Sequence, residues 1–573
     1  MVCWATTAGG VTREELPLVG CGISGIRYHM TQWMFADAAG IWWKTDNATG
    51  QQCWHDRSSN LATQYEYDAD NYPLSLPAGE YVQCYPFRHN GGHYPTGEYV
   101  LTWEGEGKAE IIRGASLVSE SANRAVYNCS STGGPGLSLA ITATTPGNHV
   151  HNLRMWMPGT EQLGSEFHPL FKERLEPFGV LRFMDPLATN GNEQVAWSDR
   201  RTPSNFFKSG ANGMAYERAV DLCNELGKDL WLNVPAKAND AFIDSLATLV
   251  RDRLQPGLRC WIEYSNETWN WNFTVQSQYT LTLKDQWGLS TRPAAHGRRS
   301  VQIFDIFERV FGGTDRLIRI MPGQARNPWQ LEEALKEAES YCSPGPLRVD
   351  VASVAYYFTD KSTCTLIWDE RNNTDKSAIW AKLYSDIDND TTPIQNFDIA
   401  QQYGLPMVGY EGGDHLNAVS QDDVLTNTEI DELALLIADI VRDPQFEDVY
   451  KYALDHWYGF GATTPVAFVN CSGWGKYGQW GHLEYQDQPL DSAPKYTALI
   501  EWADSLSALP VLRPGLHSQN GTAPITIAPS LTVFDLRGRL MLPLPQQRFL
   551  TTRRLVPGVY VAPRQSRGTL TVR

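Results

Sequence analysis

Two glutamates follow short apolar runs of the sequence. Glu267 ends the run RCWIEYSNE at 259–267, directly after Asn266, and Glu411 ends the run LPMVGYE at 405–411. A carboxyl group that stays protonated can donate a proton to a leaving oxygen, and a second, ionised one can attack or stabilise an electron-poor carbon. Burial and neighbouring charge can separate the two pKa values. This pair is therefore the strongest candidate in the chain for acid/base and nucleophilic chemistry.

Short apolar runs alternate with helical patterns through the middle of the chain, and they predict the elements that position the two glutamates. The predicted strands lie near 152–159, 179–186, 229–236, 259–267, 316–324, 349–357, 405–413 and 464–475. Helical patterns between them include 215–227, 240–254, 329–342 and 430–443. Such alternation predicts parallel strands joined by right-handed crossovers, and eight units predict an α/β fold, a (β/α)8 TIM barrel with enlarged loops. Glu267 and Glu411 then end strands four and seven, whose carboxyl ends share one face.

The order of these residues resembles that of a large clan of retaining glycoside hydrolases built on (β/α)8 barrels, clan GH-A. In that clan an Asn-Glu pair ends strand four and a single Glu ends strand seven, and Asn266, Glu267 and Glu411 match. The resemblance covers about residues 151–508. It implies that Glu267 is the acid/base and Glu411 the nucleophile, with double displacement between carboxyl groups about 5 Å apart. The sugar is left open.

Polar residues near the predicted strand ends are candidate supports for this pair. Arg182, within strand two, is expected either to hold Glu411 ionised through a charge-assisted hydrogen bond or to form an ordinary buried ion pair. Asn266 is expected to donate to a sugar 2-hydroxyl. Tyr356 or Tyr357, at the end of strand six, is expected to donate a hydrogen bond to the nucleophile.

Aromatic side chains near the same strand ends are candidates for contact with a sugar ring, because flat apolar rings suit its C–H faces. Trp474, just past strand eight, is the candidate floor under the sugar in the cleaved subsite. Trp269 and Trp271 are expected either to stack on sugar or to pack within their own loop. Trp156, at the end of the expected first strand, and His415, in the loop after strand seven, complete the candidate substrate-binding residues.

The two ends of the chain differ from the barrel region. Residues 1–150 hold short alternating runs split by turn residues, which predict an antiparallel β-rich accessory domain. Residues 509–573 predict a small β-sandwich. This tail resembles the C-terminal sorting domains of proteins that certain Gram-negative bacteria secrete, through a D-x-x-G-R turn and a later L-x-x-G-x-Y strand. The matching residues are Asp535, Gly538, Arg539, Leu555, Gly558 and Tyr560. The alternative is an ordinary accessory β-sandwich.

Composition bounds the possible partners. The 573 residues carry a net charge of −17, and an acidic chain repels phosphate backbones and anionic lipid, so no nucleic-acid partner is expected. No apolar run reaches the length of about 18 residues that a membrane-spanning helix needs. Trp and Tyr are abundant, at 20 and 25, which is compatible with sugar contacts as well as with a large core.

The ten cysteines show no metal-ligand spacing. CxxC is absent, and no Cys/His cluster has zinc spacing, so neither a metal nor another cofactor is expected. Their even number permits disulfides, and Cys3–Cys21, Cys53–Cys84 and Cys342–Cys364 are possible pairs. Two further cysteines lie inside apolar runs and are expected to be buried thiols, namely Cys223 and Cys260.

The sequence as a whole predicts a secreted or cell-surface, monomeric, multidomain retaining β-glycoside hydrolase. We expect endo-action on a β-linked polysaccharide of the glucan, mannan or xylan type. Two alternatives stay open, an exo-acting β-glycosidase and a carbohydrate-binding protein that uses the same scaffold without catalysis. No G-x-S-x-G motif is present, which argues against an esterase.

Overall fold

An eight-stranded, all-parallel sheet forms the centre of the molecule. A computed structural model describes residues 11–41, 54–133, 136–507, 533–535 and 559–561. The sheet has the order β14-β13-β12-β11-β10-β9-β1-β15. Its strands, in chain order, are β1 (Gly20–Gly22), β9 (Val180–Arg182), β10 (Asp229–Val234), β11 (Cys260–Tyr264), β12 (Leu317–Pro322), β13 (Val351–Val354), β14 (Met407–Gly409) and β15 (Val466–Ala467). A parallel bridge joins Val408 on β14 to Thr463, which lies just before β15, so the sheet is a nearly closed barrel, as predicted.

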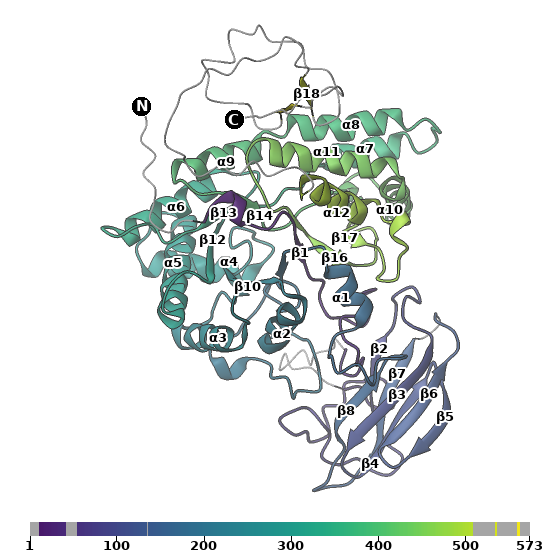
Figure 1. Ribbon diagram of the computed structural model, residues 1–573. Coiled ribbons are helices and arrows are strands. Elements are labelled where there is room, and N and C mark those ends of the chain that lie inside the picture. Colours follow the sequence, from purple (N-terminus) through teal and green to yellow (C-terminus); the bar gives the residue numbers. More distant parts are fainter. Residues whose placement is uncertain (1–10, 42–53, 134–135, 508–532, 536–558, 562–573) are drawn as a thin grey trace, which may run out of the picture.

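Helices surround this sheet (Figure 1). They are α1 (Pro169–Leu175), α2 (Tyr216–Leu226), α3 (Asp240–Arg253), α4 (Thr274–Gln286), α5 (Arg292–Phe311), α6 (Trp329–Cys342), α7 (Lys361–Asp369), α8 (Ser377–Asn389), α9 (Thr392–Gln402), α10 (Asn427–Arg442), α11 (Gln445–Gly459) and α12 (Pro494–Ser507). The start of α10 illustrates their local coding: Thr426 and Glu429 form a reciprocal capping box before an amphipathic run. No helix among the described residues is long and apolar enough to cross a membrane.

Two stacked tryptophans fill part of the barrel interior. The rings of Trp231 on β10 and Trp261 on β11 lie 5.1 Å apart, packed with branched residues of the neighbouring strands. Each indole N–H has a buried carboxylate partner: Trp231 donates to Glu263 at 2.8 Å and Trp261 donates to Asp229 at 3.0 Å. These hydrogen bonds allow two polar ring nitrogens to lie inside the barrel without losing a partner.

The first barrel strand differs from the prediction. Residues 152–159 were expected to form it, but His151–Trp156 are β8 of an antiparallel sheet, and β1 at Gly20–Gly22 takes the place between β9 and β15. The burial of β8 alternates, as suits a strand with one solvated face, whereas barrel strands are buried throughout. The sequence of β1, GCG, carries almost no strand signal.

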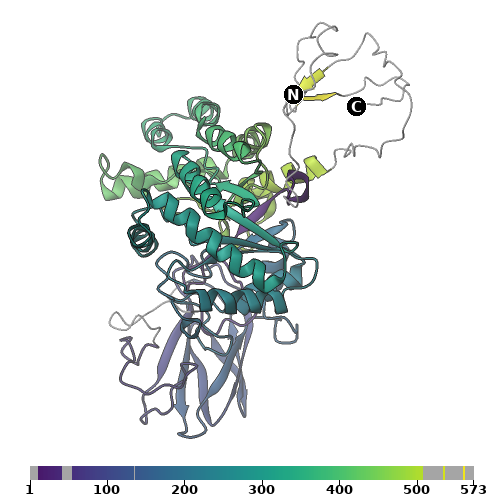
Figure 2. The same ribbon diagram turned by 90° about the vertical axis from the view of Figure 1, so that its left-hand side faces the viewer.

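Antiparallel sheets occupy the segment between β1 and β9. Their strands are β2 (Val82–Phe87), β3 (Gly97–Glu104), β4 (Gly107–Arg113), β5 (Ser116–Ser121), β6 (Arg124–Cys129), β7 (Leu137–Thr144) and β8 (His151–Trp156), in the orders β2-β7-β4 and β5-β6-β3-β8. They form a separate layered unit beside the barrel (Figures 1 and 2). The division into domains at 150 and 508 stays a prediction. The barrel strand β1 lies before residue 150, within the predicted N-terminal domain, whereas the other barrel strands lie after it.

A buried ion pair joins the inserted segment to the barrel loops. Lys208, between β9 and α2, donates to Asp37 at 2.8 Å, and the other oxygen of Asp37 accepts the backbone N–H of Met155 at 2.6 Å. Although burial opposes it, the positive charges of Lys208 and Arg154 hold the pKa of Asp37 below its usual value. The carboxylate therefore stays ionised at neutral pH and links three segments distant in sequence.

The cysteines and the tail give a mixed result. Cys342 and Cys364 are free thiols, so this possible pair does not form. Cys223 and Cys260 are buried free thiols, as predicted, and Cys3 and Cys53 lie outside the described residues.

In the tail, β18 (Val533–Asp535) pairs antiparallel with β19 (Val559–Val561), with Phe534 opposite Tyr560. The other residues of the predicted sorting motif lie outside the described residues, namely Gly538, Arg539, Leu555 and Gly558. The predicted small β-sandwich at 509–573 stays a prediction.

Candidate active site

Glu411 follows β14 and is almost fully buried, with 7% of its surface exposed. Arg182 on β9 donates through Nη1 to Oε2 of Glu411 at 3.0 Å, and the hydroxyl of Tyr357 donates to Oε1 at 3.1 Å. Both oxygens thus accept a hydrogen bond from a donor that another strand end supplies. Such donors favour the charged form of a carboxyl group, and they fix its orientation.

Glu267 follows β11 in a tight turn. Its Oε1 accepts a hydrogen bond from the Tyr410 hydroxyl at 2.9 Å and its Oε2 accepts one from Asn270 at 2.9 Å. Ser265 and Glu267 both have left-handed backbones, with φ of 58° and 39°. A non-glycine residue in that region costs on the order of 1–3 kcal/mol, and such strain persists where the surrounding structure enforces it. The turn directs the side chain of Glu267 toward that of Tyr410, the residue before Glu411.

Arg182 is the centre of the buried network. Its Nε and Nη2 both donate to the carboxylate of Glu263 at 3.0 Å, and Nη2 also donates to Oδ1 of Asn266 at 2.9 Å. Its guanidinium lies 5.2 Å from the ring centre of Tyr410. Burial opposes the charge, but the carboxylates of Glu263 and Glu411 raise the pKa of Arg182 above its ordinary value. The sequence left two alternatives for Arg182, an ordinary buried ion pair and a contact with Glu411. Arg182 makes both, the first with Glu263 and the second with Glu411 itself.

The charge of Glu267 affects the ionisation of Glu411. Burial raises the pKa of Glu411 to about 8; the charge of Glu267 acts in the same direction, and Arg182 and the Tyr357 hydroxyl act in the opposite one. The pKa of Glu411 is thus set by two opposed influences, and the hydrogen bonds from Arg182 and Tyr357 are the ones that favour its anion.

Of the two tyrosines predicted to serve the nucleophile, only Tyr357 contacts its carboxylate. The hydroxyl of Tyr356 lies 3.1 Å from that of Tyr450, which in turn lies 2.6 Å from Nε2 of His482. Tyr356 therefore points into the core behind the loop, and only its backbone N–H meets Glu411, at the carbonyl, at 3.0 Å.

Asn266 lies at the predicted position, but its amide is already engaged. Its Oδ1 accepts from Arg182, and its Nδ2 donates to Oδ1 of Asn190 at 3.0 Å. Asn190, in the loop after β9, also accepts from Gln276 at 2.8 Å. Donation from Asn266 to a sugar hydroxyl stays a prediction. Asn190 was missed because nothing in its local sequence distinguishes it from other loop asparagines.

A cluster of aromatic rings lies beside Tyr357. His415 is 5.1 Å from Tyr357 between ring centres, and Trp480 is 5.9 Å from Tyr357 and 5.5 Å from His415. Trp474, the predicted floor, makes other contacts: its Nε1 donates to the Gly481 carbonyl at 3.0 Å, and its ring faces basic side chains. Its place under a sugar stays a prediction. Both tryptophans follow strand eight in one loop, and the sequence offers no way to tell which of them turns toward the site.

Two other predicted aromatic contacts are placed differently. Trp156 is on β8 in the antiparallel sheet, where its Nε1 donates to Thr102 at 3.3 Å, so it does not end a barrel strand. Trp269 is in the right loop but is only 7% exposed, packed against His296 and Tyr410. Of the alternatives for the Trp269/Trp271 pair, Trp269 therefore packs within the protein.

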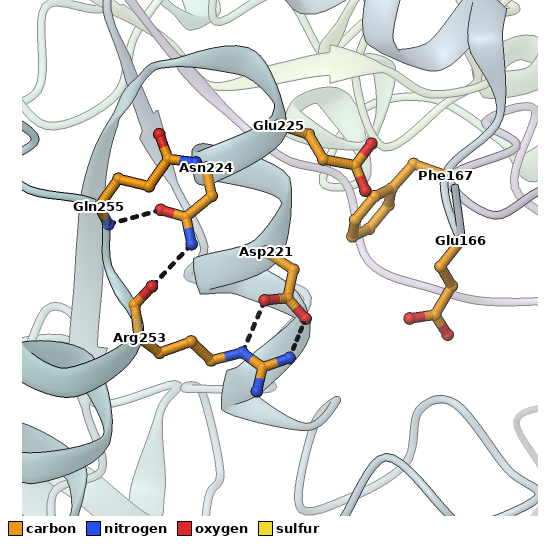
Figure 3. Close-up of a pocket in the computed structure, with 7 residues that line it drawn as sticks. All are labelled: Glu166, Phe167, Asp221, Asn224, Glu225, Arg253 and Gln255. Atoms are coloured by element: carbon orange, nitrogen blue, oxygen red, sulfur yellow. Dashed lines mark hydrogen bonds and ion pairs between the residues drawn. The ribbon is translucent and has the colours of Figure 1, made fainter. Parts of the chain in front are cut away.

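A pocket with a different lining is shown in Figure 3. It is lined by Glu166, Phe167, Asp221, Asn224, Glu225, Arg253 and Gln255. The ends of α2 and α3 contribute to it, and these ends lead into β10 and β11, so the pocket belongs to the barrel face opposite the strand carboxyl ends. Arg253 and Asp221 satisfy each other in a two-fold ion pair at 2.6 Å. Among the described residues no group of three or more His, Cys, Asp or Glu could hold a metal ion.

Comparison with known proteins gives distant structural similarities only. No protein-family model and no curated protein matches the sequence. Similar solved structures include a GH51 arabinofuranosidase from Xanthomonas axonopodis pv. citri, with 14% identity and a TM-score of 0.37, over 59% of this chain and 66% of that one. A 4-O-α-L-rhamnosyl-β-D-glucuronidase from Fusarium oxysporum has 13% identity and a TM-score of 0.37, over 58% and 64%.

A third similar structure is an endo-1,4-β-D-xylanase with CBM22-1 and GH10 modules from Clostridium thermocellum. It has 8% identity and a TM-score of 0.34, over 82% of this chain and 97% of that one. The chain spans just under two thirds of the first two proteins. These similarities are distant, and none of them assigns an activity to this chain.

Proposed function

We propose that this protein is a retaining β-glycoside hydrolase in which Glu411 is the nucleophile and Glu267 the acid/base. The observation that carries the proposal is the difference between the surroundings of the two carboxyl groups. Arg182 contacts Glu411 at 3.0 Å, whereas Glu267 receives only neutral donors, from Tyr410 and Asn270. The positive charge of Arg182 favours the anion on Glu411, which suits a nucleophile, and the neutral donors beside Glu267 suit a group that gives up a proton and takes one back.

The proposed reaction has two steps. In the first, Glu411 attacks the anomeric carbon, the bond from that carbon to the leaving oxygen breaks, and the proton of Glu267 passes to that oxygen. In the second, Glu267 takes a proton from a water molecule whose oxygen attacks the same carbon and releases Glu411. Two inversions restore the original anomeric configuration. Arg182 and Tyr357 position the nucleophile, and Tyr410 and Asn270 position the acid/base.

The proposed substrate is a β-linked polysaccharide of the glucan, mannan or xylan type, cleaved internally by a secreted or cell-surface enzyme. The aromatic side chains near the strand ends support a carbohydrate, since Tyr357, His415 and Trp480 gather beside the nucleophile. An exo-acting glycosidase would use the same pair, and product length separates the two modes of action.

A test of the proposal is hydrolysis of cellulose, mannan, xylan and β-1,3-glucan by the wild type and Glu411→Gln. We expect the wild type to release sugar from one of them, the variant to lose at least about a thousandfold in kcat, and NMR to show retained configuration. Glu225→Gln, an exposed glutamate of the pocket in Figure 3, is the matched control and should keep full activity. A wild type that binds sugar without cleaving it would favour the carbohydrate-binding alternative, and inversion would contradict the role of Glu411.

A further inference from the structure

A solvent-exposed tryptophan lies on the same turn as Glu267. Trp271 is 58% exposed, whereas Trp269, two residues earlier, is 7% exposed and packs inside. A large apolar ring in water loses the free energy that burial would provide, on the order of 2 kcal/mol. Trp271 therefore presents apolar surface that a ligand can cover.

Hydrogen bonds within the turn fix the position of this ring relative to the Glu267 carboxyl group. The N–H of Asn270 donates to the carbonyl of Glu267 at 2.8 Å, and its side chain donates to the Glu267 carboxylate at 2.9 Å. The N–H of Phe273 donates to the carbonyl of Asn270 at 3.1 Å. Residues 267–273 thus form one hydrogen-bonded turn, with the carboxyl group of Glu267 at its start and the indole of Trp271 near its end.

Arg292 supports the ring from outside the turn. This first residue of α5 places its guanidinium carbon 4.0 Å from the Trp271 ring centre, and its Nη2 donates to the Trp269 carbonyl at 2.7 Å. The cation occupies one face of the indole and anchors it to the turn, which limits the rotation of the side chain. The indole is therefore a fixed surface before any ligand binds.

We propose that Trp271 is the stacking platform for the sugar ring on the leaving-group side of the scissile bond. The inference rests on the proposed function, because a general acid must reach the leaving oxygen and so lies on the leaving-group side. A platform fixed to the same turn then meets the sugar that departs with that oxygen. The ligand class is a pyranose whose C–H face covers the indole. Binding energy from this remote contact is available to lower the barrier for cleavage.

The test compares two substrates that differ in the leaving group. Trp271→Ala and the wild type are assayed on β-1,4-linked gluco-, manno- and xylohexaose and β-1,3-linked glucohexaose, and on the β-glycosyl fluoride of whichever sugar the wild type cleaves. Fluoride carries no sugar ring to stack. We expect kcat/KM on the hexaose to fall about tenfold or more and kcat/KM on the fluoride to stay within about twofold.

Trp368→Ala is the control, because Trp368 on α7 also lies against an arginine, Arg371, at 4.1 Å but is not part of the turn that carries Glu267. It should change neither rate. Equal losses on both substrates in Trp271→Ala would make Trp271 a support for Glu267 and overturn the proposal, as would no loss on either. A wild type that cleaves neither substrate would contradict the proposed function itself, which is a distinct outcome.

Discussion

At Glu411, burial and charge act in opposite directions on one carboxyl group. Burial and Glu267 raise its pKa, while Arg182 and the Tyr357 hydroxyl favour its anion. The Tyr357 hydroxyl at 3.1 Å and the Arg182 guanidinium at 3.0 Å are thus the contacts that favour the ionised form of Glu411, which is the form that attacks. The sequence predicted that Arg182 and one of two tyrosines would contact Glu411. It did not predict that Glu263 accepts two hydrogen bonds from Arg182. Glu263 lies within strand β11, and the sequence of a strand does not show which residue of another strand a side chain will contact.

Replacing Tyr357 with phenylalanine should weaken the nucleophile without changing the packing. The variant loses one hydrogen bond to Glu411, so we expect kcat to fall about tenfold and the acidic limb of the pH profile to move to higher pH. Tyr356→Phe is the matched control, since its hydroxyl meets Tyr450 and not Glu411. Equal effects of the two substitutions on the pH profile would argue against the assigned contact.

Replacing Glu267 with glutamine should lower the pKa of Glu411. The negative charge of Glu267 raises that pKa, so removing the charge lets Glu411 ionise at lower pH. The pH dependence of inactivation by a 2-deoxy-2-fluoro glycoside with an activated leaving group reports the ionised nucleophile. We expect its midpoint to fall in Glu267→Gln relative to the wild type, and an upward shift would mean that the two groups do not interact as described.

At the scale of elements, the strands that carry chemistry were predictable and the first strand was not. The sequence runs that form β11 and β14 are apolar and end in polar residues. Both this pattern and their position as the fourth and seventh of eight predicted strands identified them. β1 consists of glycines around one cysteine, and its role follows from what surrounds it: a Cβ on Gly22 would lie 2.0 Å from the carbonyl oxygen of Phe468. Only tertiary contact reveals that requirement, and without it Trp156 was assigned to the wrong sheet.

Gly22→Ala should therefore destabilise the barrel. The added Cβ would meet the backbone carbonyl of Phe468, which cannot move aside as the end of a flexible side chain could. We therefore expect the free energy of unfolding to fall by about 1–3 kcal/mol. Gly459→Ala is the control, because nothing lies within 4 Å of its added Cβ. Urea unfolding followed by fluorescence measures both, and an unchanged stability in Gly22→Ala would show that β1 is not packed as described.

At the scale of the whole molecule, one buried ion pair connects the antiparallel sheets to the barrel. Lys208 reaches Asp37 at 2.8 Å, and Arg154 on β8 reaches the same carboxylate at 3.3 Å. Sequence patterns predicted both kinds of sheet, but they could not reveal that the antiparallel segment lies between the first and second barrel strands. That arrangement depends on contacts between residues more than a hundred positions apart.

Asp37→Asn should weaken this connection because it leaves Lys208 buried without its partner charge. Breaking a buried pair costs on the order of 3–5 kcal/mol. Asp37 has a lowered pKa, so its contribution is present above the pKa of the unfolded chain and is lost as pH falls through the lower, folded-state pKa. Thermal unfolding from pH 7 to pH 2 should therefore show a smaller acid-dependent loss in the variant. Asp252→Asn, an exposed site, is the control, and a variant that melts like the wild type at pH 7 would contradict the role of the pair.

Azide rescue tests the assignment of the two glutamates most directly. Glu411→Ala leaves space for azide to attack the anomeric carbon of an activated β-glycoside in place of the nucleophile, and a single inversion then gives the α-glycosyl azide. Glu267→Ala keeps the nucleophile, so azide attacks the covalent intermediate and gives the β-glycosyl azide. We predict these two opposite products by NMR. The same anomer from both variants, or rescue of neither while the wild type is active, would contradict the central claim.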